Sequence, residues 1–177
     1  MNLYLRLLWT LLRSWRLPPL TIEHTLKRTM RVLPNDLDIN GHMNNGRYLT
    51  TIDLLLLEYS VRIGFARVLM RKRWRPMAGG SIISYRRALQ PFQSYTIHFK
   101  LEACDAAWNY MRFEFHSGGK ICAAGYVKGA AVSNAGLVPT ATSYAELGAV
   151  RLARPIPDAV PHWLDGERAI FADTMRV

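Results

Sequence analysis

The chain has 177 residues, of which half are hydrophobic and 20% are charged. This composition excludes a disordered or fibrous protein and suits about one globular domain with short appendages. The net charge of +10 at pH 7 calls for an anionic partner such as nucleic acid, acidic lipid headgroups or a phosphorylated cofactor. Charge alone does not choose among these. The two cysteines, Cys104 and Cys122, lack metal-site spacing and are expected in the core, which favours a reduced, cytoplasmic setting.

Residues 1–20 alternate leucine and tryptophan with a few polar residues and predict an amphipathic helix that ends at Pro18 and Pro19. Its apolar stretch is shorter than the ~20 residues needed to span a bilayer. The residues predicted to form its narrow polar face are Arg6, Thr10, Arg13 and Ser14.

Two main interpretations of this helix remain open, and a cleaved signal peptide is a weaker third, because arginines continue through the segment and no small-residue cleavage site follows. One is an interfacial helix that contacts the inner face of a membrane through residues 1–16, with its arginines at the headgroups and Trp9 and Trp15 at the boundary. The other is a helix packed on the domain or on a dimer partner. The first interpretation implies a peripheral membrane location, and the second implies only a structural role.

The next segments predict one strand and one long helix. Residues 24–33 roughly alternate polar and apolar side chains, as a strand with one buried face does. Residues 35–45 are rich in Asn, Asp and Gly and are expected to form a loop. Residues 45–67 carry apolar side chains at helical spacing, and the run 54–57 makes the helix apolar on more than one face. Such a helix is expected to be buried against a sheet.

A basic loop is expected after this helix, followed by antiparallel strands with turns between them. The strand candidates cover residues 81–89, 94–104, 108–116 and 120–133. In the tail, Thr142 or Ser143 is expected to cap a short helix ending near Gly148, and residues 165–175 predict another helix.

This order predicts an α+β fold in which an antiparallel sheet wraps around one long central helix. The expected divisions are an N-terminal helix over residues 1–20, a main domain over 21–135 and a C-terminal extension over 136–177.

A polar motif stands immediately before the long helix, and it reads Asp36-Leu-Asp38-Ile-Asn40-Gly41-His42-Met-Asn44-Asn45-Gly46-Arg-Tyr48. A helix N-terminus offers unpaired N–H groups and a partial positive charge, which stabilise a carboxylate and can hold a developing oxyanion. Asp38 in this loop is therefore a candidate to attack a thioester or to activate a water.

The motif resembles the loop-to-helix segment of hotdog acyl thioesterases, of both the 4-hydroxybenzoyl-CoA type and the plant acyl-ACP type. The resemblance covers about residues 22–133. It implies a hotdog fold and hydrolysis of acyl-CoA, or of acyl-carrier-protein thioesters, by a homodimer or a dimer of dimers. It implies no metal and no cofactor beyond the coenzyme A of the substrate.

The resemblance also assigns roles to residues. Asp38 falls on the catalytic aspartate, acting as nucleophile or general base, and in the plant type Asn40 and His42 join it. The substrate-binding candidates at the start of the helix are Asn44, Asn45, Gly46 and Tyr48. The plant type has an acidic residue after Tyr-Arg-Arg, but here Ala88 follows Tyr85-Arg86-Arg87, so that the mechanism is expected to depend on Asp38 and the helix N-terminus.

Structural roles compete with these assignments. His42 could instead hold the loop, Asn44 and Asn45 could act only as helix-start residues, and Tyr48 could lie in the core. The basic group between Arg62 and Arg75 could be a solvated helix end, or it could dock coenzyme A phosphates. The remaining histidines are predicted to be ordinary surface or edge residues, because their spacing in the sequence suggests no partner. They are His24, His98, His116 and His162.

Of two other functions, one remains open. A non-catalytic module that binds acyl chains or membrane lipid, with residues 1–16 as its anchor, would bind acyl-CoA without turnover. Nucleic-acid binding is not expected, because no aromatic-plus-basic recognition motif is present.

Overall fold

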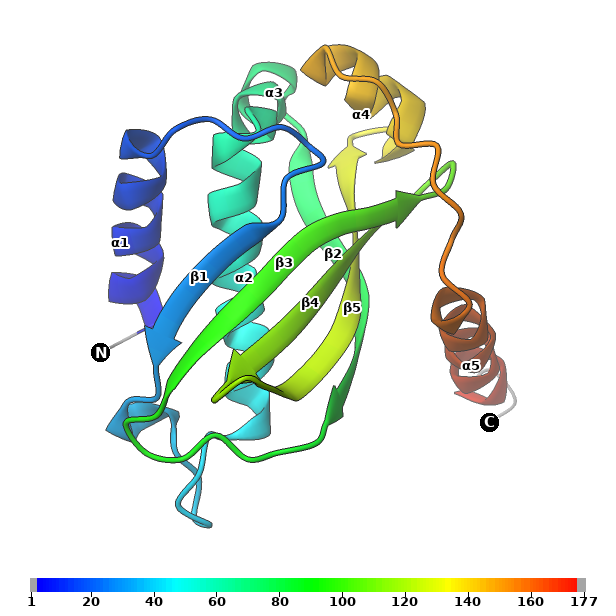
Figure 1. The fold of residues 1–177 in the computed structure, drawn as a ribbon. Coiled ribbons are helices and arrows are strands. Elements are labelled where there is room, and N and C mark those ends of the chain that lie inside the picture. The colour runs from blue at the N-terminus through cyan, green and yellow to red at the C-terminus, as the bar shows by residue number, and fades with distance from the viewer. Residues whose placement is uncertain (1–2, 175–177) are drawn as a thin grey trace.

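The computed structural model describes residues 3–174, and in it an antiparallel sheet curls around one long helix (Figure 1). The helices are α1 (Leu3–Arg16), α2 (Asn45–Arg62), α3 (Phe65–Lys72), α4 (Thr140–Leu147) and α5 (Ala159–Thr174), with a 3-10 turn over Pro34–Asp36. The strands are β1 (Leu26–Arg31), β2 (Arg75–Tyr85), β3 (Ser94–Cys104), β4 (Asn109–Ser117), β5 (Lys120–Ser133) and β6 (Gly136–Val138). They lie in the order β1-β3-β4-β5-β2, and β6 pairs with β5.

The main core lies between α2 and the concave face of the sheet. Ile52 and Leu55 of α2 are buried in the same cluster as Phe99 of β3 and Phe113 of β4. Along β3, buried side chains alternate with partly exposed ones, as they do in a sheet with one covered face. Burial of large apolar side chains contributes about 1.5 to 3 kcal/mol each, so this layer dominates the stability of the fold.

The α+β hotdog arrangement is confirmed, and β3 and β5 have the bounds expected from the sequence. The long helix is shorter than predicted. It ends at Arg62 because Gly64 adopts a left-handed conformation with φ of +84°, a conformation that glycine adopts without a Cβ clash. The basic segment that follows is mainly helix α3 and not a loop.

The predicted bounds of β2 were wrong at both ends. It begins at Arg75 and ends at Tyr85, and its pairing with β5 shifts register between Ala78 and Gly80. This irregularity hides the strand period in the sequence. Leu89 is not in a strand. It is fully buried in the core, and its carbonyl oxygen accepts the Met43 N–H at 2.9 Å.

Both C-terminal helices begin earlier in the sequence than predicted. Helix α4 begins at Thr140, before the two predicted cap residues, and ends at Leu147 with Gly148 as its C-cap, near the predicted end. Helix α5 begins at Ala159, six residues before the predicted start. The last predicted residue of that helix, Met175, lies outside the described residues, and strand β6 was not predicted. The divisions at residues 20/21 and 135/136 stay predictions.

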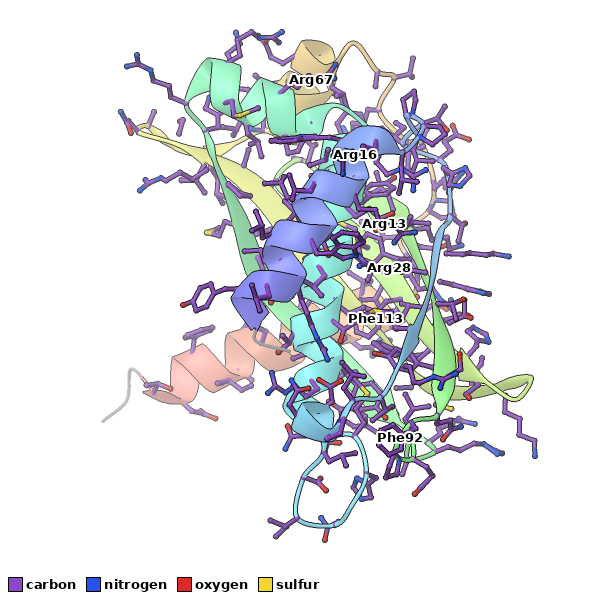
Figure 2. All side chains as sticks on the ribbon, turned by 90° about the vertical axis from the view of Figure 1, so that its left-hand side faces the viewer. Arg13, Arg16, Arg28, Arg67, Phe92 and Phe113 are labelled. Carbon is purple, nitrogen blue, oxygen red and sulfur yellow. The ribbon has the colours of Figure 1, made fainter. Side chains whose placement is uncertain are left out.

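Helix α1 lies against α2 (Figure 2). Its polar face is turned inward, where it bonds the 3-10 turn and β1. Arg6, Thr10 and Ser14 are buried. The Arg6 guanidinium donates to Asp36 Oδ2 at 2.8 Å, and Arg28 of β1 donates to Thr10 Oγ1 at 3.1 Å. The interpretation of a helix packed on the domain is thus supported, and the placing of Arg6 at lipid headgroups was wrong.

Glu58 is the second acid beneath this helix. Its carboxylate accepts from Arg28 at 3.0 Å and from Arg62 at 3.0 Å, and Arg13 of α1 lies 3.8 Å away. Because the Glu58 side chain is 2% exposed, these arginines supply the countercharge that a buried carboxylate needs. Together, Asp36 and Glu58 bind α1 to the rest of the fold.

The outer face of α1 is apolar, which reverses the usual polarity of a surface helix. Trp9 and Trp15 are 58% and 64% exposed. The other large exposed side chains on this helix are Tyr4, Leu5, Leu7, Leu8 and Leu12. Within residues 3–174, no helix has the length and hydropathy required to cross a membrane.

The buried pair of Arg6 and Asp36 generates a stability prediction. Asp36→Asn leaves the Arg6 charge buried without a partner charge, and we expect the free energy of unfolding to fall by about 3 to 5 kcal/mol. Urea denaturation followed by circular dichroism measures this change. The control Asp165→Asn removes one partner of the exposed pair between Asp165 and Arg168 and should leave stability nearly unchanged. Equal effects of the two substitutions would contradict the prediction.

Candidate active site

The motif forms a tight loop between the 3-10 turn and α2. A β-bridge between Leu37 and Met43 closes its base. Inside the loop, the Asp38 N–H donates to the His42 carbonyl at 2.9 Å, and the Gly41 N–H donates to the Asp38 carbonyl at 3.1 Å. Gly41 has φ of +76°, which a residue with a Cβ rarely adopts. The loop is therefore held by its own backbone.

The Asp38 carboxylate lies on the inner side of this loop with 18% of its side chain exposed. Its Oδ1 accepts the Asn40 N–H at 2.9 Å. Its Oδ2 lies 3.4 Å from His42 Nδ1, close enough for electrostatic attraction but without the geometry of a hydrogen bond. The structure thus brings Asp38, the Asn40 backbone and His42 together. The Asn40 side chain itself is exposed.

Most of the backbone N–H groups at the start of α2 that could bind an oxyanion already donate to acceptors within the protein. Asn44 is the N-cap residue, and its Oδ1 accepts the Gly46 N–H at 2.9 Å. The Asn44 N–H donates to the Asp36 carbonyl at 2.8 Å. Among these three backbone donors in the described chain, only the Asn45 N–H has no internal acceptor. Of the N–H groups of Asn44, Asn45 and Gly46, the Asn45 N–H is therefore the candidate donor to an oxyanion.

Tyr48 lies in the core and not at the loop surface. Its side chain is 2% exposed, and its ring packs edge-on against Phe115 at 4.8 Å and Tyr85 at 5.1 Å between centroids. Burial raises the pKa of the Tyr48 hydroxyl to about 12. Tyr48 thus positions the start of α2. Tyr85 supports the same helix end, because its hydroxyl donates to the Asn45 carbonyl at 3.1 Å.

An apolar cavity of about 360 Å³ lies farther along α2, between this helix and strands β2 and β5. Leu56 and Leu57 of α2, Ile63 just after this helix and Met77 of β2 contribute to its lining. Its size and lining suit an acyl or aromatic group. No residue of the Asp38 to Tyr48 segment lines it, so that the loop and the cavity are separate within one chain.

Asp53 is the carboxyl group in this cavity lining. Desolvation raises its pKa above the ordinary value for aspartate, as an apolar setting does. The sequence analysis did not single out Asp53. The available signal was a carboxylate on an otherwise apolar stretch of helix, two turns after the N-cap.

The basic group after α2 is only partly available to a ligand. Arg62 binds Glu58, and Arg71 and Lys72 bind Glu146. The exposed members of the group that form no ion pair within residues 3–174 are Arg67, Arg73 and Arg75. Two of them, Arg73 and Arg75, lie at the junction of α3 and β2.

Comparisons with known proteins agree with this architecture. A family model described as the thioesterase-like superfamily matches residues 32–164, which is more than half of the chain. Among curated proteins, Protein THEM6 of Danio rerio is 31% identical over 117 residues, which cover 64% of this chain and 57% of that protein. The chain thus matches less than two thirds of the length of this relative.

Two solved structures show the same fold. The gentisyl-coenzyme A thioesterase BH1999 superposes with a TM-score of 0.60 at 17% identity, covering 67% of this chain and 98% of that one. The protein SAV2348 from Staphylococcus aureus, solved in complex with CoA, has a TM-score of 0.61 at 12% identity, covering 80% of this chain and 94% of that one. At these identities the likeness concerns the fold alone.

Proposed function

Because the chain belongs to the thioesterase-like superfamily, we propose that it hydrolyses acyl thioesters of coenzyme A, with Asp38 as the catalytic carboxylate. One observation carries this assignment. Asp38 is held by the Asn40 N–H in a rigid loop at the N-terminus of α2, and its second oxygen is left beside His42. Extension to acyl-carrier-protein thioesters remains part of the proposal, because the same bond is cleaved.

In the proposed reaction, the thioester carbonyl oxygen accepts the Asn45 N–H, which the helix dipole makes a favourable contact for a developing oxyanion. Asp38 either attacks the carbonyl carbon or takes a proton from a water that attacks it. The carbon–sulfur bond then breaks, and the thiolate leaves and takes up a proton. If a water attacked, this step gives the free acid directly. If Asp38 attacked, it gives a mixed anhydride on Asp38, which a water hydrolyses to the free acid and the restored carboxylate. His42, beside Asp38, is suited to move the proton that the thiolate takes up. The reaction uses no cofactor beyond the coenzyme A of the substrate.

The other residues of the motif support this site. Asn44 caps α2 and so fixes the direction of the Asn45 N–H, while Gly46 donates to that cap. Tyr48 supports the helix start from the core. The exposed arginines at the α3–β2 junction suit the phosphates of coenzyme A, since guanidinium groups bind phosphate strongly. The CoA complex of SAV2348 makes such a ligand plausible for this fold.

We also propose that the chain works as a homodimer or a dimer of dimers, joined first at strand β2. This strand has eleven residues, pairs only with β5 and lies at the edge of the sheet. A long open edge is a ready surface for pairing with another chain. Met77 and Ile82 of β2 are exposed, and β2 also lines the apolar cavity. A partner at this edge would cover the cavity and could bring its own loop to it.

A third part of the proposal is that α1 rests on the surface of an anionic membrane, at its cytoplasmic face. The exposed tryptophans and leucines of α1 suit the boundary between headgroups and acyl chains. Arg16 is exposed and Arg13 partly so at the C-terminal end of the helix, where they can meet acidic lipid. The polar face of α1 takes no part in this lipid contact, because it is buried against the domain and its Arg6 charge is paired with Asp36.

A substrate panel tests the catalytic assignment. We expect the protein to cleave at least one of a short, a long and an aromatic acyl-CoA, and Asp38→Asn to lower kcat/KM by about 10²- to 10⁴-fold. Thiol release is the measurement. Asp165→Asn should keep the full rate. Full activity in Asp38→Asn, or a larger loss in Asp53→Asn, would contradict the assignment. Acyl-CoA binding without turnover would favour the alternative of a non-catalytic acyl-chain or lipid-binding module.

The oligomeric state tests the β2 edge. We expect the wild-type protein to have at least twice the chain mass by light scattering, and Ile82→Lys to shift it toward the monomer because a charge would be buried at the interface. Ile121→Lys is the matched control, since Ile82 and Ile121 are both 42% exposed but Ile121 lies on β5. A monomeric wild type, or a mass unchanged by Ile82→Lys alone, would argue against this interface.

Vesicle binding tests the lipid contact. We expect each of Trp9→Ser and Trp15→Ser to weaken partition onto vesicles of mixed neutral and anionic lipid by about tenfold, the equivalent of one large side chain leaving an apolar phase. Sedimentation with vesicles is the measurement. Phe171→Ser on α5, where Phe171 is 60% exposed, should have no effect. Binding that survives the double tryptophan variant would rule out α1 as the contact.

A further inference from the structure

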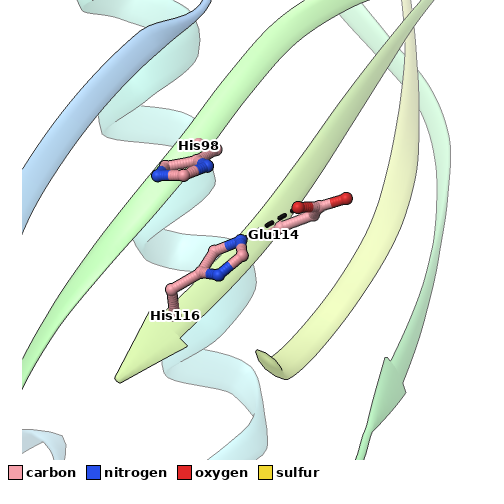
Figure 3. Close-up of side chains that lie close together, drawn as sticks. All are labelled: His98, Glu114 and His116. Atoms are coloured by element: carbon pink, nitrogen blue, oxygen red, sulfur yellow. Dashed lines mark hydrogen bonds and ion pairs between the residues drawn. The ribbon is translucent and has the colours of Figure 1, made fainter. Parts of the chain in front are cut away.

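A second cluster of chemically active side chains lies on the outer face of the sheet, away from α2 (Figure 3). His98 of β3 pairs in register with Glu114 of β4, and His116 follows two residues later on the same strand. Ile97 and Phe115, which form the neighbouring pair in the same ladder, are buried in the core. Alternation along the strands therefore gathers these three side chains on the opposite face.

The donor atoms of this cluster are close enough to share one ion. One ligand atom from each of His98, Glu114 and His116 lies within 4.8 Å of the other two. His116 Nε2 is 2.9 Å from Glu114 Oε2. Metal bonds of ~2.0 to 2.2 Å hold neighbouring donors roughly 3 Å apart, so this pair already has the required spacing. All three side chains are half-buried, and the His98 ring stacks on the His116 ring with 4.3 Å between centroids. A shared ion therefore requires the His98 ring to rotate about its side-chain bonds.

The Glu114 carboxylate is oriented by a neighbour on the same strand. Arg112 donates to Glu114 Oε1 through Nε at 2.9 Å and Nη2 at 2.6 Å. This leaves Oε2 turned toward His116. Partners of this kind fix the direction of a metal-binding side chain and are typical of metal sites in proteins. Arg112 also carries a positive charge, as does Lys27 opposite His98, and both charges lower the affinity for a cation.

The ligand set indicates the kind of ion. Two imidazoles and one carboxylate suit zinc and the neighbouring divalent transition metals, whereas magnesium and calcium prefer sites made entirely of oxygen ligands. Three protein ligands leave at least one position open to water. The cluster joins β3 to β4, so that a bound ion would link two strands of the sheet.

We propose that His98, Glu114 and His116 bind one divalent transition-metal ion of the zinc class on the outer face of the sheet. The core of the protein separates this site from α2 and from the apolar cavity, so that the ion stabilises the strand pair and takes no part in thioester hydrolysis. The proposal is independent of the proposed function and stands or falls separately from it.

The test uses full-length protein without an affinity tag, freed of metal by a chelator. Zinc is titrated by calorimetry, and cobalt(II) is added separately because its visible absorption reports ligand geometry. We expect one zinc ion per chain and a rise in Tm, since a ligand bound only by the native state stabilises it. We expect His98→Gln and His116→Gln each to weaken binding by about tenfold or more and to abolish the visible cobalt band.

His162→Gln is the matched control, because His162 lies on α5, outside the cluster, and its ring hydrogen-bonds with the Asp158 carbonyl. It should bind zinc as the wild type does. Circular dichroism of the metal-free variants shows whether each one folds, and two separate histidine variants allow for the loss of one. The proposal is overturned if the wild type takes up no zinc, or if both cluster variants bind it as tightly as His162→Gln does.

Discussion

The arrangement of the chain depends on the hydrogen bonds and the ion pair of the buried residue Asp36. It binds Arg6 of α1 through Oδ2, the same oxygen accepts the Leu33 N–H, and the Asp36 carbonyl accepts the Asn44 N–H at the start of α2. One residue thus joins the N-terminal helix, the end of β1 and the N-cap of the central helix. Because the loop of Asp38 begins two residues later, its position relative to α2 follows from the same contacts. The charge is tolerated in the interior because Arg6 neutralises it.

Regular periodicity explains which parts of the fold could be predicted from the sequence. Strands β3 and β5 and the start of α2 were located correctly, since their apolar residues repeat with the period of the element. The break at Gly64 was missed because leucine and valine on either side of it continue a helical pattern, and the bulge near Gly80 hid the true start of β2. The residue types before α2 could indicate that the helix begins at a capping residue. They could not indicate that the Asn44 side chain accepts the Gly46 N–H and so makes it unavailable to a substrate.

Contacts between distant residues account for what the sequence did not reveal. Asp36 lies in the segment expected to be a loop, and its burial was not expected because its partner Arg6 lies thirty positions away. His98 and His116 looked like isolated surface histidines, because their proximity depends on the register of β3 and β4, and a bulge between Leu101 and Ala103 interrupts that register. Desolvation raises the pKa of Asp53 in a cavity to which three helices and four strands contribute residues. In each case the missing information was a tertiary pairing and not a residue preference.

The inverted polarity of α1 has a consequence for the energetics of any surface that it contacts. Most amphipathic segments that bind lipid or protein are disordered beforehand, and part of their binding energy is lost in forming the helix. Here the helix exists before binding, because salt bridges to Asp36 and Glu58 hold it on the domain. Its outward tryptophans and leucines are displayed in a fixed geometry, so that association costs no ordering of the backbone. For the proposed lipid contact, this means that the acids beneath α1 contribute to the affinity without touching the lipid.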